Sequence, residues 1–174
     1  MKEIIEFLHK IQQYKKIKRA GWVRKKIPDP ESDADHSFAV TMMTYLLADR
    51  VGIDKDKAIK MALIHDLHEV VCGDITPHDN YSKEEKDKIE SDAMKQLVKD
   101  IDNKEMLELW NELAEEKTPE AKFIENIDKL ELAFQTYLYE KENPNLDLEE
   151  FWTFCDKRIK DPKLREIFKS LKHK

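Results

Sequence analysis

Glycine and proline are scarce in this chain, and they fall between segments of helical periodicity rather than inside them. The 174 residues include three glycines and six prolines. Helix-capping signals stand before most of these segments: Ser32 with Asp35, Ser82 with Glu85, Thr118 with Pro119, and the aspartates Asp54, Asp102 and Asp147. Such punctuation is typical of helices joined by short loops, and no segment alternates like a β-strand.

The apolar spacing between these signals predicts helices at residues 2–13, 33–51, 55–72, 83–100, 103–116, 119–140, 147–158 and 162–172. The chain has no internal repeat, low-complexity stretch or interdomain linker, and its length suits one domain. We therefore expect an all-α fold, a single helical bundle of about seven to nine helices that spans residues 1–174.

The composition is that of an ordinary globular protein. Charged residues make up 39% and apolar residues 40%, with a formal net charge of -6. This balance excludes a disordered chain, and it shows no basic surface of the kind that binds a nucleic-acid polymer. A basic cluster at residues 14–26 suits a small anion. No run is apolar enough for a membrane span, and the charged N-terminus is unlike a secretory signal, so we expect a cytoplasmic protein. We interpret Cys72 and Cys155 as small core residues.

The segment "ALIHDLHEVVCGD" at residues 62–74 combines apolar and ionisable residues in one expected helix. Its apolar residues point almost all around the axis, which predicts a buried helix. At about 100° per residue, His65, Asp66 and Glu69 share one sector, and His68 lies to the other side. Burying such groups costs several kcal/mol each unless they are paired or bind a metal. The spacing therefore favours a ligand-binding cluster.

Two further residues in other expected helices could complete a metal site: His36, within "SDADHSFAV", and Asp128, within "AKFIENIDKLELAF". A mixed set of nitrogen and oxygen donors suits Mn, Fe, Co, Ni or Zn better than Ca. Spacing alone leaves other interpretations open. The histidines could be hydrogen-bonded core residues, Asp128 could pair with Lys129, and His68 could also be a ligand. The order "HDLHE" differs from the HExxH of zinc proteases.

Four blocks, "RAGWV" (19–23), "PESDADHSFAV" (30–40), "ALIHDLHEVVCGDITP" (62–77) and "EAKFIENIDKLE" (120–131), resemble the HD-domain 5'-deoxynucleotidases, a branch of the HD-domain metal-dependent phosphohydrolases. The resemblance runs from about residue 3 to about residue 155. It implies a helical domain, often dimeric, that removes the 5'-phosphate from deoxyribonucleoside 5'-monophosphates with a divalent transition metal.

The resemblance also implies roles for individual residues. The metal ligands are His36, His65, Asp66 and Asp128, and His68 is left out. Glu69 and Asp74 match a pair of acids near the substrate, whose role in different members is proton transfer, sugar contact or the binding of a second divalent ion. Arg19 matches the residue that orients the phosphate. Trp22 is assigned to the substrate, although bacterial members place this tryptophan directly after the arginine and here Ala20 and Gly21 intervene.

Related HD-domain enzymes hydrolyse deoxynucleoside triphosphates or cyclic nucleotides, and these remain alternatives. The triphosphate enzymes are usually longer and more basic, and the cyclic phosphodiesterases commonly use additional histidines for two metals. A third alternative is a sensor that binds a metal or nucleotide without turnover. A sensor has no need of an extra acid such as Glu69, so we expect an enzyme.

Overall fold

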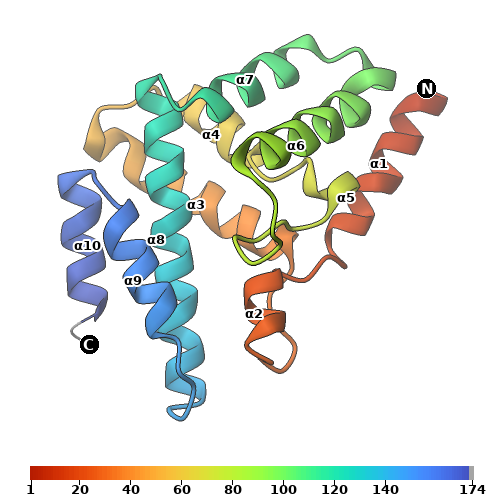
Figure 1. The fold of residues 1–174 in the computed structure, drawn as a ribbon. Coiled ribbons are helices and arrows are strands. Elements are labelled where there is room, and N and C mark those ends of the chain that lie inside the picture. The colour runs from red at the N-terminus through yellow and green to blue at the C-terminus, as the bar shows by residue number, and fades with distance from the viewer. Residues whose placement is uncertain (173–174) are drawn as a thin grey trace. The chain divides into compact units, whose positions relative to one another are not determined.

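The computed structural model describes the backbone of residues 1–172 and the side chains of residues 1–99 and 101–172. Its helices are α1 (Lys2–Tyr14), α2 (Ala20–Arg24), α3 (Asp33–Val51), α4 (Lys55–Ile64), α5 (Glu69–Cys72), α6 (Lys83–Val98), the 3-10 helix η1 (Lys99–Ile101), α7 (Lys104–Glu115), α8 (Pro119–Glu142), α9 (Glu149–Arg158) and α10 (Pro162–Lys172) (Figure 1). The described residues contain no β-strand, only an isolated antiparallel bridge between Lys18 and Ser32. The all-α prediction is confirmed.

The helix expected over residues 55–72 is interrupted, and the prediction of one continuous helix is wrong there. Helix α4 ends at Ile64 and α5 begins at Glu69. Between them, backbone N–H groups donate to the carbonyl three residues earlier: Leu67 N to Ile64 O at 3.1 Å, and Glu69 N to Asp66 O at 3.0 Å. Because these bonds close tighter turns than an α-helix, the helical-wheel geometry does not hold across this segment.

Most of the expected capping residues act as predicted. Ser32 and Asp35 form a reciprocal pair, as do Ser82 and Glu85, and Thr118 Oγ1 accepts from Ala121 N. The start of α7 is a correction. Its cap is Asn103, whose side chain accepts from Met106 N at 3.0 Å, whereas Asp102 has a left-handed backbone with φ 45°.

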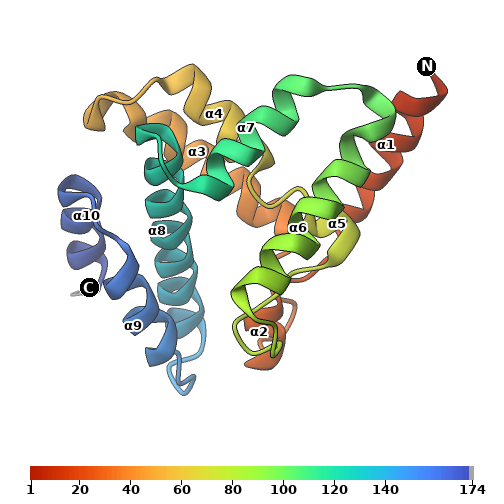
Figure 2. The same cartoon turned by 45° about the horizontal axis from the view of Figure 1, so that its top comes forward.

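The contacts within the chain define two compact units, which we describe separately. Unit 1 comprises Met1–Phe38 and Leu63–Glu115, and unit 2 comprises Ala39–Ala62 and Glu116–Lys174. In unit 1, α6 contacts α5 and α7, and α1 contacts α5 (Figure 2). The buried residues at the centre of unit 1 are Tyr14, Ile64, Leu67, Met94, Leu97, Val98 and Trp110.

Unit 2 is built on α8, a helix of 24 residues that packs against α9 and α10 (Figures 1 and 2). One side chain of α8 joins it to the loop before α10. Asn126 Oδ1 accepts from Lys160 N at 2.5 Å and from Asp161 N at 3.0 Å, while its Nδ2 donates to Lys122 O at 2.7 Å. The buried side-chain amide therefore pairs with two backbone N–H groups of this loop.

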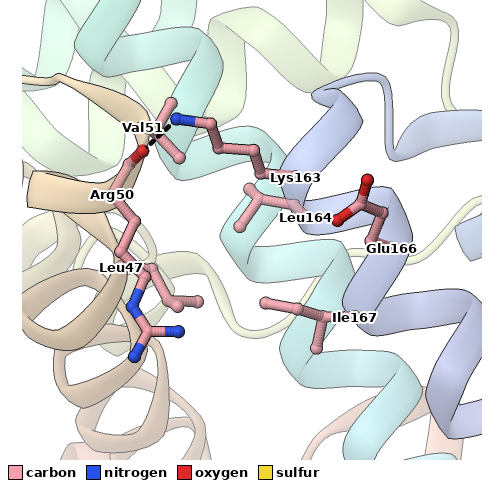
Figure 3. A pocket seen from close by; sticks show the side chains of 7 residues that line it. All are labelled: Leu47, Arg50, Val51, Lys163, Leu164, Glu166 and Ile167. Atoms are coloured by element: carbon pink, nitrogen blue, oxygen red, sulfur yellow. Dashed lines mark hydrogen bonds between the residues drawn. The ribbon is translucent and has the colours of Figure 1, made fainter.

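Unit 2 also contains an open pocket of about 330 Å³, lined by Leu47, Arg50, Val51, Lys163, Leu164, Glu166 and Ile167 (Figure 3). Lys163 Nζ donates to the Arg50 carbonyl, near the end of α3. None of the site residues predicted from the sequence lines this pocket. Among the described residues, no helix has the length and apolar character needed to cross a membrane.

Candidate metal and phosphate site

The backbone places Arg19 beside the start of α3. Arg19 N donates to Glu31 O at 3.1 Å, Asp33 N donates to Ile17 O at 2.9 Å, and Lys18 pairs with Ser32 in the β-bridge. These bonds join the segment before α2 to the segment that leads into α3. As a result, these backbone bonds hold Arg19 next to the first turn of α3 within unit 1.

His36 lies one turn into α3 and is fully buried. Ser32 and Asp35 close the first turn of the helix: Ser32 Oγ donates to Asp35 Oδ2 at 2.7 Å, and Asp35 N donates back to Ser32 Oγ at 3.2 Å. This capping box fixes the direction of the helix start and with it the direction of the imidazole.

The structure brings His36, His65 and Asp66 together in unit 1. His65 Nε2 lies 3.4 Å from His36 Nε2 and 3.2 Å from Asp66 Oδ2, and His36 Nε2 lies 3.7 Å from the same oxygen. One ligand atom from each residue lies within 4.8 Å of the other two. Two imidazole nitrogens and a carboxylate oxygen at this spacing fit a divalent transition metal.

Arg19 lies against the carboxylates of this cluster. Its Nη1 donates to Asp66 Oδ2 at 3.1 Å and lies 3.8 Å from Glu69 Oε1. Asp74 Oδ1 is 4.0 Å from the same nitrogen. Three predicted site residues, Asp66, Glu69 and Asp74, therefore lie around Arg19. Two more, His36 and His65, contact Asp66.

The two central carboxyl groups have opposite acid–base character. Burial raises the pKa of Asp66, but His65, Arg19 and His36 outweigh it and hold this pKa well below its usual range. Burial raises the pKa of Glu69 well above its usual range, and the negative charge of Asp66 adds to this shift. Neighbouring carboxyl groups with pKa values pushed apart are characteristic of sites that handle charge and protons.

Asp74 follows Gly73, which ends α5 with φ 77°. As predicted, the aspartate lies in the loop directly after the helix. Its Oδ2 accepts a hydrogen bond of 2.7 Å from Ala20 N, the first residue of α2. Asp74 therefore fixes the start of α2, directly after Arg19, in addition to any contact with a substrate.

Trp22 lies in α2 and is 1% exposed. Its Nε1 donates to Glu31 Oε1 at 2.7 Å. The indole therefore connects α2 to the segment before α3. The short helix α2 itself was not among the helices expected from the sequence, because five residues give too little periodicity to detect.

His68 is buried and has two polar neighbours in unit 1. Trp110 Nε1 donates to His68 Nδ1 at 3.2 Å, which places the histidine proton on Nε2. That nitrogen lies 3.5 Å from Glu90 Oε1. These contacts connect α7 and α6 to the start of α5, and they give His68 a structural role.

Asp128 lies in α8 of unit 2 and is 8% exposed. Lys129 Nζ contacts Asp128 Oδ2 and lies 3.6 Å from Glu125 Oε2. The ion pair that the sequence suggested as an alternative is therefore present. The assignment of Asp128 as the fourth metal ligand stays a prediction.

Asp33 and Tyr14 also belong to this part of unit 1, and the sequence did not identify them as site residues. Burial raises the pKa of the Tyr14 hydroxyl well above its usual range, and the negative charges of Asp66 and Glu69 add to this shift. The hydroxyl lies 2.7 Å from Ser37 Oγ. Asp33 occurs one turn before His36 on α3, a spacing that could have drawn attention to it.

Comparison with known proteins places the chain in a family. The HD domain family matches residues 11–168. The curated 5'-deoxynucleotidase HDDC2 of Danio rerio is 36% identical over 175 residues, covering 98% of this chain and 87% of the relative. The 5'-deoxynucleotidase hdd1 of Schizosaccharomyces pombe is 39% identical over 167 residues, covering 91% of this chain and 83% of the relative.

A solved structure supports the same placement. A conserved hypothetical protein from Pyrococcus furiosus is 34% identical, with a TM-score of 0.82, and the match covers 98% of this chain and 99% of that chain. The chain belongs to the HD domain family, and the resemblance identified in its sequence is confirmed. Membership of this family and the His36, His65 and Asp66 cluster together imply a divalent metal.

Proposed function

We propose that this protein is a metal-dependent 5'-deoxynucleotidase, which hydrolyses deoxyribonucleoside 5'-monophosphates to the deoxynucleoside and phosphate. The observation that carries the proposal is the cluster of His36, His65 and Asp66 beside Arg19. Support comes from relatives that are named 5'-deoxynucleotidases and match nearly the whole chain. The family match includes residues of both units, which supports treating residues 1–174 as one HD domain.

His36, His65 and Asp66 would hold the metal, and we assign Asp128 as the fourth ligand from the sequence resemblance. The donor types favour Mn, Co, Ni, Fe or Zn. A metal bound in this way supplies a water of lowered pKa and a positive charge for the phosphoryl oxygens. We further propose that Glu69 and Asp74 provide oxygens for a second divalent ion.

Arg19 orients the phosphate. A guanidinium offers a planar pair of N–H donors that matches two phosphate oxygens, and burial beside carboxylates keeps it in one place. The contact between Arg19 Nη1 and Asp66 Oδ2, at 3.1 Å, places the phosphate-binding group next to a metal ligand. Phosphate and metal would thus be held by neighbouring groups.

Glu69 is the proposed proton-transfer residue. It lies four residues after His65 in the sequence and 3.8 Å from Arg19 Nη1, so its carboxyl faces the expected phosphate position. From there it can accept the proton of the attacking water or donate one to the leaving 5'-oxygen.

The sugar is assigned to Asp74 and Trp22. Asp74 Oδ2 already accepts from Ala20 N, so Oδ1 is the oxygen that we assign to a sugar hydroxyl. Because Trp22 is 1% exposed, we propose that it acts on the sugar 2'-position indirectly, by holding α2 in place through Glu31.

We also propose a homodimer. Phe38, Met42, Tyr45 and Leu46 of α3 are exposed apolar residues at helical spacing. Such a stripe is typical of an interaction surface, and size-exclusion chromatography with light scattering measures the oligomeric state. The cytoplasmic location expected from the sequence likewise stays a proposal.

The test is a panel of deoxyribonucleoside and ribonucleoside 5'-monophosphates, incubated with purified protein and Mn or Co. We expect phosphate release from deoxyribonucleotides, which Asp66→Ala abolishes and Asp87→Ala leaves unchanged, since Asp87 is exposed on α6 and pairs with Lys83. Release from deoxynucleoside triphosphates or cyclic nucleotides instead would favour the related enzyme classes. Metal binding without any turnover would favour a sensor and refute the proposal.

A further inference from the structure

Asp33, the first residue of α3, is a buried carboxyl group that the proposed reaction does not use. It is fully buried, and among the described residues neither of its oxygens has a hydrogen-bond donor. Glu69 Oε2 is also buried without a donor. Buried polar atoms of this kind are rare in folded proteins, and each is expected to have a ligand or a function.

The charged groups that affect the pKa of Asp33 all belong to the candidate site of unit 1. They are the positive charge of Arg19, the negative charges of Asp74 and Asp66, and the Glu69 carboxyl at hydrogen-bonding range. Two ionised carboxylates only accept hydrogen bonds, so Asp33 and Glu69 satisfy each other only when one of them carries a proton. Burial, opposed by Arg19, raises the pKa of Asp33 to about 7.

When all four carboxyl groups are ionised, the charges of this cluster do not balance. Asp33, Asp66, Glu69 and Asp74 bring four carboxyl groups to one guanidinium, that of Arg19. Buried carboxylates are tolerated when a cation or hydrogen bonds compensate for the lost hydration. A hydrated divalent cation would supply both positive charge and water O–H donors to the oxygens that lack them.

We propose that Asp33 belongs to the second divalent-cation site, where it acts with Glu69 on the buried side of the ion. The inference rests on the proposed function and adds Asp33 to the Glu69 and Asp74 that the sequence suggested. The donors are all carboxylate oxygens, unlike those of His36 and His65. Such a set suits a hydrated Mg²⁺ or Mn²⁺, which keeps several of its waters, so Asp33 contacts the ion directly or through one of them.

The experiment is Mn²⁺ binding to metal-stripped full-length protein, followed by electron paramagnetic resonance and calorimetry. We expect two classes of Mn²⁺ site, one that binds the ion tightly and one that binds it more weakly. Asp33→Asn, nearly identical in shape and uncharged, should weaken the second class at least about 10-fold and leave the tight class unchanged. Glu69→Gln should do the same, and Asp87→Asn, an exposed change of the same charge, should alter neither class.

Thermal unfolding gives a second measurement that a purely structural role would not affect. In chelator, Asp33→Asn should unfold at the same or a higher temperature, because a buried carboxyl is removed, while the stabilisation by Mg²⁺ should be lost. Unchanged Mn²⁺ classes in Asp33→Asn, or loss of the tight class, would overturn this inference. A native protein with one tight ion and nucleotidase activity would overturn it while leaving the proposed function intact, and no Mn²⁺ binding at all would contradict both.

Discussion

Two groups of buried polar side chains, one in each unit, differ in how their polar atoms are compensated. In unit 2, Asn126 makes three hydrogen bonds, and Trp152 Nε1 donates to Glu140 Oε2 at 2.9 Å. In unit 1, oxygens of Asp33 and Glu69 are buried without a donor among the described residues. Hydrogen-bonded polar groups stabilise a fold, whereas uncompensated ones destabilise it and are retained where a ligand needs them.

This contrast predicts which substitutions will affect activity and which will affect stability. Changes around Asn126 should lower the free energy of unfolding with little effect on turnover. Changes around Arg19 and His36 should affect metal or substrate binding with little loss of stability. The first three of the four predictions below test this division, from the largest effect to the smallest.

Asp128 is the residue that tests the division most strongly, because it lies in unit 2 and we assign it to the metal. Outer-shell residues of metal sites typically contribute about 10–100-fold to affinity or activity, so loss of a ligand in Asp128→Ala should reduce phosphate release by more than about 100-fold. The bound metal, measured by mass spectrometry, should fall in parallel. Asp156→Ala, which removes an exposed aspartate paired with Arg165, is the control.

The competing interpretation is that Asp128 only pairs with Lys129. In that case Asp128→Ala would keep its metal and its activity, and only the stability of α8 would change.

Arg19→Ala should raise KM for a deoxyribonucleoside monophosphate by roughly 10- to 100-fold, as expected when charge-assisted hydrogen bonds to phosphate are lost. The metal content should stay at the native level. Steady-state kinetics and metal analysis measure the two effects, with Arg24→Ala, at the end of the short helix that follows Arg19, as the control. Loss of metal in Arg19→Ala would show that the guanidinium supports the metal ligands instead.

Asn126→Ala should lower the free energy of unfolding by about 2–4 kcal/mol, because the N–H groups of Lys160 and Asp161 lose their acceptor. Urea denaturation measures this change, and kcat at a temperature where the variant is folded should match that of the native protein. A stable but inactive variant would contradict the structural role of Asn126.

The two thiols should be poorly reactive. Burial raises the pKa of Cys72 to about 11 and that of Cys155 to about 12. At pH 8 the alkylation of Cys72 by iodoacetamide should therefore be at least about 100-fold slower than that of an ordinary cysteine, and that of Cys155 slower still, because only the thiolate reacts. Rapid labelling of Cys72 would refute its interpretation as a core-type residue.

Much of the fold follows from local signals in the sequence. The capping residues Ser32, Ser82 and Thr118 begin their helices as predicted, because capping depends on a few neighbouring residues. The break after Ile64 did not follow, because the apolar pattern continues through residues 65–68 while the backbone there forms tighter turns. Periodicity reports which residues are buried and is insensitive to a short interruption.

The site was predicted in part. His36, His65 and Asp66 lie close together as expected, and Arg19 lies beside them. Asp33 was missed because the sequence shows it only as one acid in a capping segment, and its burial depends on long-range packing. The hydrogen bond from Ala20 N to Asp74 was equally invisible, since it joins residues 54 positions apart.

The most direct test of the account compares metal-dependent phosphate release from a deoxyribonucleoside 5'-monophosphate by the native protein, Asp66→Ala and Asn126→Ala, all in the folded state. We predict that the native protein and Asn126→Ala release phosphate once Mn or Co is added to the metal-stripped protein, and that Asp66→Ala does not. Activity in Asp66→Ala, or its absence in folded Asn126→Ala, would contradict the division between the two units.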